Sequence, residues 1–172
     1  MNYRGQDKEA INNNYLANLK YEGLFKNHIQ TILNIELIKT ADRYSHYDFK
    51  YNNNIIEYKG VYYTLDNDNN IAYSKEKNKN SINSVIIGED KIKHYKQMKN
   101  KNNDLKVYLF YGFYDLDTEK GKIKEIIYKY LDISNLLNDI LTEFNKFEYN
   151  NKSHFQIPIK LLEDVNKNLI MN

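Results

Sequence analysis

The sequence of 172 residues contains no cysteine and no tryptophan, one proline and six glycines. The lack of cysteine excludes disulfide bonds, thiolate zinc sites and a cysteine nucleophile, and it fits an intracellular protein. The polar segment Met1–Lys8 predicts no signal peptide. The longest apolar run, Val107–Tyr114, is far shorter than the roughly 18 residues of a membrane helix. We therefore expect an intracellular protein with no membrane partner.

The charge is small overall but uneven along the chain. The net charge of +2 does not by itself identify a nucleic-acid-binding protein. Between Lys75 and Lys101, however, eight lysines face only three acidic residues, a local excess of +5. Such a segment is either a solvated helix face or a surface that attracts phosphates.

The periodicity of apolar residues predicts an alternation of helices and strands. We expect helices over about 7–39, 89–99, 133–144 and 161–170, and strands over about 47–51, 55–64, 71–73, 106–114 and 123–131. Pro158 cannot donate a ladder hydrogen bond, so we expect 156–160 to be a short edge segment. The order of elements predicts a single α/β domain over residues 1–172, with a central mixed β-sheet flanked by helices.

A predicted hairpin carries the most informative residues. Asp48 lies on one strand, the turn contains Asn52, and Glu57-Tyr58-Lys59 lies on the next strand. Side chains alternate along a strand, so Glu57 and Lys59 point the same way. Two carboxylates and an ammonium would then converge, and hard oxygen ligands of this kind suit Mg²⁺. The alternative is an exposed cross-strand ion pair of little consequence.

Glu22 lies on the apolar stripe of the first predicted helix, together with Phe25, Ile29 and Leu33. A carboxylate on a core-facing stripe is costly unless it is paired or binds metal. Glu22 is therefore either a third acid of the site or a rim residue that reaches water or a lysine.

Five further polar residues are candidates for binding nucleic acid. Arg43 and His46 precede the first strand, where they could reach phosphates or base edges. The helix after Gly88 carries Lys91, Lys93 and Gln97, and its sequence does not distinguish which side chain faces a ligand. Ordinary turn residues and a solvated helix face are the alternatives.

Asp48, followed after nine residues by Glu57-Tyr58-Lys59 within this order of elements, resembles the PD-(D/E)XK or restriction-endonuclease-like nuclease superfamily. Small type II restriction enzymes and compact viral or phage nucleases have a similar layout. The proline that often precedes the acid is Tyr47 here. The resemblance implies a nuclease core over about 10–115 and a C-terminal elaboration over about 116–172.

The resemblance also implies a function. Asp48, Glu57 and the backbone carbonyl of Tyr58 would bind Mg²⁺, with Mn²⁺ as a substitute, and Glu22 would do so directly or through water. Lys59 would orient the attacking water, and beside two carboxylates we expect its ammonium form to be favoured. The expected activity is metal-dependent hydrolysis of DNA phosphodiester bonds by an endonuclease. The alternatives are a catalytically inactive DNA-binding or assembly protein on the same fold, and an unrelated α/β protein.

The biological setting stays open at this point. Restriction, mobile-element cleavage, viral DNA processing, and processing of replication or recombination intermediates all use such an activity. Cutting both strands of a duplex needs two sites, so we expect a homodimer.

Overall fold

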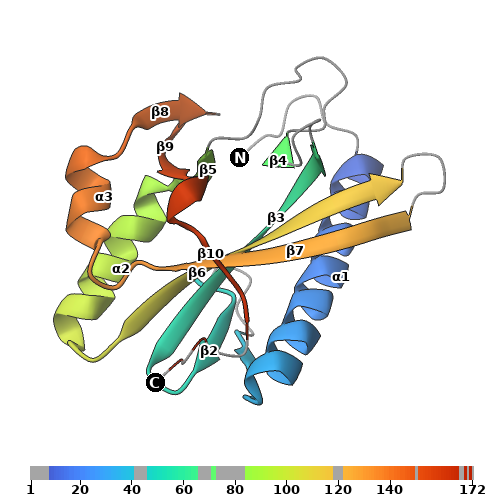
Figure 1. Cartoon of the computed structure of the whole chain (residues 1–172). Coiled ribbons are helices and arrows are strands. Elements are labelled where there is room, and N and C mark those ends of the chain that lie inside the picture. Colours follow the sequence, from blue (N-terminus) through green and yellow to red (C-terminus); the bar gives the residue numbers. More distant parts are fainter. Residues whose placement is uncertain are drawn as a thin grey trace.

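The computed structural model describes residues 8–40, 46–65, 71–72, 84–117, 122–149, 151–166, 169 and 171 (Figure 1). The helices are α1 (Lys8–Leu33), α2 (Glu89–Lys101) and α3 (Leu137–Glu143), with a 3-10 turn η1 (Ile159–Leu161). The strands are β1 (Ile38–Lys39), β2 (Phe49–Tyr51), β3 (Asn54–Leu65), β4 (Ile71–Ala72), β5 (Ser84–Gly88), β6 (Lys106–Asp117), β7 (Lys122–Asp132), β8 (Lys146–Tyr149), β9 (Lys152–Pro158) and β10 (Glu163–Asp164). None of the helices described is long and apolar enough to cross a membrane.

A mixed sheet forms the centre of the molecule, with strand order β1-β2-β3-β6-β7-β10 and with β4 paired to β3. The central pair β3–β6 is parallel, and the other pairs of this sheet are antiparallel. The long crossover between the two parallel strands contains α2, as such connections usually contain a helix. The structure confirms the expected α/β architecture, with a mixed sheet and flanking helices.

Helices cover both faces of the sheet (Figure 1). On one face, Phe25 and Ile29 of α1 are fully buried in a cluster with Ile56 and Phe110. The other face carries α2 and α3, and a second cluster there includes Ile92. Neighbouring residues of β3 fall into different clusters because side chains alternate across a strand. The same alternation directs Glu57 toward α2 and Tyr58 toward α1.

A second, three-stranded sheet has the order β5-β9-β8. Its β9 is the middle strand, so the predicted edge segment at 156–160 was wrong. Pro158 is compatible with this position because it is the last residue of β9, opposite Ser84. Val85, Ile87, Phe155 and Ile157 of this sheet pack into the cluster beneath α2.

Two predicted helices have different limits in the structure, and a third is replaced by other elements. The first ends at Leu33, where Asn34 adopts a left-handed φ of 53°, and Ile38–Lys39 is a strand instead. The third begins only at Leu137. The predicted helix over 161–170 was wrong, because Glu163 and Asp164 instead pair with Tyr130 and Lys129 at the edge of the main sheet.

Candidate active site

The site lies where β2 separates from β3. β2 pairs with β3 only from Asn54 to Ile56, whereas β3 continues to Leu65. On this side, the described strands offer β3 no further partner until β4 pairs at Thr64. Among the described strands, the stretch that contains Glu57, Tyr58 and Lys59 therefore pairs with β6 on one side and forms an open edge on the other.

Asp48 covers the first part of this open edge. Its amide donates to the Ile56 carbonyl at 2.9 Å, and its Oδ2 accepts the Tyr58 amide at 2.7 Å. The amide and carbonyl of one strand residue point to the same side. The Tyr58 carbonyl therefore faces the open edge beside the Asp48 carboxylate. Thr40 fixes this segment, because its amide donates to the Asp48 carbonyl at 3.0 Å.

Glu57 is almost completely buried, with 4% of its side chain exposed. Its Oε1 forms an ion pair with the Lys91 ammonium from the first turn of α2. Its Oε2 lies 3.2 Å from the Tyr95 hydroxyl, one turn further along the same helix. A buried carboxylate needs such partners, since leaving it without them is costly. The structure thus selects Lys91, and not the exposed Gln97, as the residue of α2 that enters the site.

Tyr95 is a site residue that the sequence did not single out. Its hydroxyl also donates to the His46 carbonyl at 2.5 Å, so it ties the segment before β2 to α2. Burial, followed by the charge of Glu57, raises the pKa of Tyr95 and keeps this hydroxyl protonated. Its spacing of four residues from Lys91, on the buried face of α2, was the available signal.

Tyr95→Phe tests this tie. The variant leaves the His46 carbonyl and Glu57 Oε2 without their shared donor, so we expect the free energy of unfolding to fall by about 1 to 3 kcal/mol. Urea denaturation followed by circular dichroism measures the change. Tyr111→Phe is the matched control on the same face of the sheet, because the Tyr111 hydroxyl lies 3.4 Å from its acceptor, the Ile86 carbonyl. Equal losses in the two variants would contradict a specific role for Tyr95.

The carboxylates of Asp48 and Glu57 influence each other. Burial and then the negative charge of Glu57 raise the pKa of Asp48 to about 7, while Lys91 opposes the rise. The side chain of Asp48 is nevertheless held at its place by the Tyr58 amide. Two neighbouring carboxylates repel each other, so a positive charge bound at the open edge would be favourable.

Lys59 experiences two opposing effects. Burial lowers its pKa, whereas the negative charges of Glu57 and Asp48 raise it, and the net shift is downward. The second ammonium, Lys91, adds to the lowering. Within the described residues, Lys59 forms no ion pair. Perturbed pKa values cluster at functional sites, so the lowered pKa makes Lys59 a candidate site residue.

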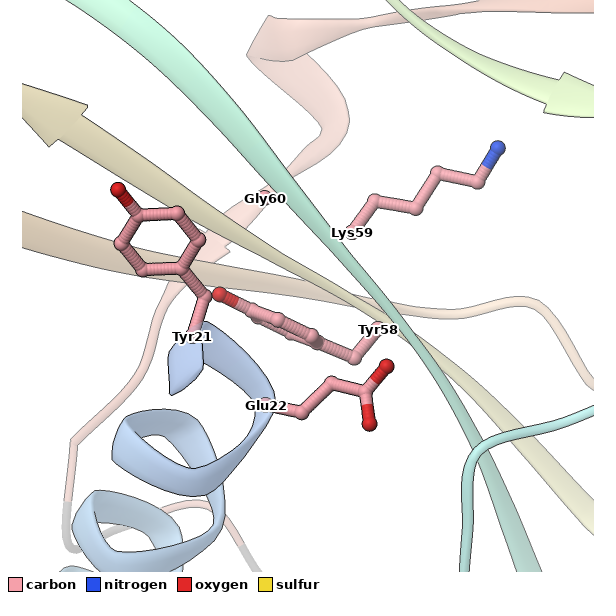
Figure 2. Close-up of a pocket in the computed structure, with 5 residues that line it drawn as sticks. All are labelled: Tyr21, Glu22, Tyr58, Lys59 and Gly60. Atoms are coloured by element: carbon pink, nitrogen blue, oxygen red, sulfur yellow. The ribbon is translucent and has the colours of Figure 1, made fainter. Parts of the chain in front are cut away.

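Glu22 lies at the rim of the same region (Figure 2). An open pocket of about 240 Å³ is lined by Tyr21, Glu22, Tyr58, Lys59 and Gly60. In Figure 2, α1 contributes Glu22, whose carboxylate points toward β3, and the Lys59 side chain extends from the other side of that strand. Glu22 forms an ion pair of 2.5 Å with Lys39, and its charge contributes to the raised pKa of Asp48.

The remaining candidates are spread more widely. The His46 ring stacks on His94 of α2, with a centroid distance of 3.8 Å. Lys93 points away from Glu57 and pairs with Glu89 at 2.9 Å. Arg43 lies outside the described residues. Of the predicted nucleic-acid ligands, the structure therefore brings Lys91 into direct contact with the site.

The donor set suits a hard divalent cation with several waters. Asp48 and Glu57 offer carboxylate oxygens, and the Tyr58 carbonyl faces the same edge. Mg²⁺ in proteins commonly uses one or two carboxylates and keeps much of its hydration. No group of three or more acidic, histidine or cysteine side chains suited to a metal occurs in the part of the chain that the structure describes. Glu22 is accordingly not gathered with Asp48 and Glu57 as a third direct ligand.

Comparison with known proteins adds no identification. No protein-family model, no curated protein and no solved structure matches this chain significantly.

Proposed function

We propose that this protein is a metal-dependent DNA endonuclease with a restriction-endonuclease-like, PD-(D/E)XK-type core. The observation that carries the proposal is the cluster at the open edge of β3. Asp48 and Glu57 lie close enough for the charge of one to raise the pKa of the other, and Lys59, two residues beyond Glu57, forms no ion pair with any residue that the structure describes. An incidental surface hairpin would have no reason to bury these groups.

Each residue has a definite part in the proposed reaction. Bound Mg²⁺, or Mn²⁺ in its place, would supply a hydroxide-like water and neutralise phosphate charge. Asp48, Glu57 and the Tyr58 carbonyl would hold the cation, and Glu22 would reach it only through water. Lys59, with its lowered pKa, gives up a proton more readily than an exposed lysine and is suited to orient and deprotonate the attacking water.

The open edge also leaves room for the substrate. Because β2 ends its pairing at Ile56, no described strand covers the side of β3 from which a phosphate would approach. The lysines of α2 add positive charge nearby, although Lys93 is engaged with Glu89. A homodimer would supply the second site that double-strand cleavage needs, and the dimer is part of the proposal.

Incubation with supercoiled plasmid tests the activity. We expect nicked and linear products with Mg²⁺ or Mn²⁺ and none with a chelator. The Lys59 and Asp48 variants described in the Discussion serve as site controls. Cleavage that persists in both variants would refute the assignment of the site. Metal-insensitive duplex binding without cleavage would instead favour the inactive DNA-binding protein.

Sedimentation of the protein, alone and with a short duplex, tests the dimer. Two copies on one duplex are expected if both strands are cut in one encounter, and a single copy would contradict this part of the proposal.

A further inference from the structure

The ion pair between Lys91 and Glu57 joins a flexible cation to a proposed metal ligand. Glu57 is 4% exposed and Lys91 is 26% exposed, so the carboxylate is buried while the ammonium reaches the surface. A carboxylate with this little exposure requires a positive partner. Lys91 supplies that partner from the first turn of α2, on a long side chain that can leave without disturbing the helix.

Each oxygen of Glu57 already has one partner. Oε1 contacts the Lys91 ammonium, and Oε2 lies 3.2 Å from the Tyr95 hydroxyl. Each oxygen keeps a second lone pair, but a cation bound to Oε1 would lie beside the Lys91 ammonium and repel it. Tyr95 is fully buried and is held by the His46 carbonyl, whereas Lys91 is partly exposed. Lys91 is the partner that can yield.

The charges at the site lead to the same conclusion. The Glu57 carboxylate and the Lys91 ammonium neutralise each other in their ion pair. A divalent cation added at Glu57 would place further positive charge beside that ammonium in a partly buried place. Like charges at such distances repel, so the cation and the ammonium of Lys91 oppose each other.

We propose that Lys91 is a positioning residue that competes with the divalent cation for Glu57. It holds the buried Glu57 carboxylate in place when no metal is bound, and it moves away when the cation binds. The ion pair therefore orders the metal-free site and lowers its affinity for the cation. This inference rests on the proposed metal-dependent function. It adds that competition with Lys91 sets the affinity of the site for Mg²⁺.

Calorimetric titration with Mg²⁺ of the full chain tests the competition without any cleavage assay. We expect Lys91→Met to bind Mg²⁺ about 5- to 150-fold more tightly than the native protein, the range typical of coupling between two binding events. The same variant should melt at a lower temperature without metal, because Glu57 has lost its cation. Lys93→Met is the matched control: it removes a lysine of the same helix that pairs with Glu89, and its Mg²⁺ affinity should stay native.

A second measurement uses the native protein. The ammonium resonance of Lys91 in ¹⁵N-lysine NMR should report a protected ion pair that is lost as Mg²⁺ is added. Unchanged or weaker Mg²⁺ binding by Lys91→Met, or a resonance that stays protected at saturating Mg²⁺, would overturn the competition alone. If neither the native protein nor the variant binds Mg²⁺, the competition and the proposed function both fail.

Discussion

Lys59→Met is expected to reduce Mg²⁺-dependent plasmid cleavage by about 100- to 1000-fold, within the range usual for losing one positioned general base. Methionine has a similar length and preserves the apolar stem, so the fold is kept. Because burial lowers the pKa of Lys59, keeping its ammonium form in the folded site carries a free-energy cost that methionine does not have. The variant should therefore melt at an equal or higher temperature near neutral pH while it loses activity.

This combination separates a catalytic role from a structural one. Initial rates of plasmid nicking and a thermal melt of the same preparation provide both readings. Lys160→Met, at an exposed position of η1, serves as the control and should change neither. Native cleavage rates in Lys59→Met would remove Lys59 from the mechanism, and a large drop in melting temperature would assign it to the fold.

Asp48→Asn should stabilise the protein above pH 7. The pKa of Asp48 is raised from 3.8 to about 7 in the folded state, so folding favours the protonated carboxyl. Its contribution to stability is fully present below about pH 4 and is lost as the pH rises through about 7. Asparagine stays neutral and still accepts the Tyr58 amide. We expect the free energy of unfolding at pH 8 to rise by on the order of 3 kcal/mol, and to change little at pH 4.

Urea denaturation at a series of pH values measures this difference. Asp104→Asn, at an exposed turn after α2, is the control and should follow the native curve. The same Asp48 variant should lose plasmid cleavage, because it loses a charged ligand. An unfolding curve that parallels the native one at every pH would show that Asp48 has an ordinary environment.

Much of the site could be predicted from local sequence. Strand alternation places Glu57 and Lys59 on one face, and the Asn52 turn brings the Asp48 segment back beside β3. Glu22 was assigned to the stripe of Phe25 and Ile29, and its pairing with a lysine was one of the two alternatives considered. These features depend on spacing over a few residues, which the sequence displays directly.

Other parts depend on contacts between distant segments. The choice of Lys91 over Gln97 follows from how α2 lies on the sheet, and the role of Tyr95 requires both Glu57 and the His46 carbonyl to be in place. The lowered pKa of Lys59 results from burial, which spacing does not reveal. The predicted helix over 161–170 was wrong because pairing with β7 at the sheet edge overrides local helical periodicity.

The pairing of β5 with β9 has a consequence for the order in which the protein forms during synthesis. β5 runs directly into α2, which carries Lys91 and Tyr95, yet β5 pairs with a strand that is translated about seventy residues later. Chains emerge from the ribosome N-terminus first, and contacts between distant segments form last. The segment with Asp48 and Glu57 is thus made early, and α2 can pack on β3 and β6 soon afterwards. The small sheet that runs into α2 is completed only once β9 has been made. Until then, the first turn of α2, where Lys91 lies, lacks the strand pairing that fixes its N-terminal end.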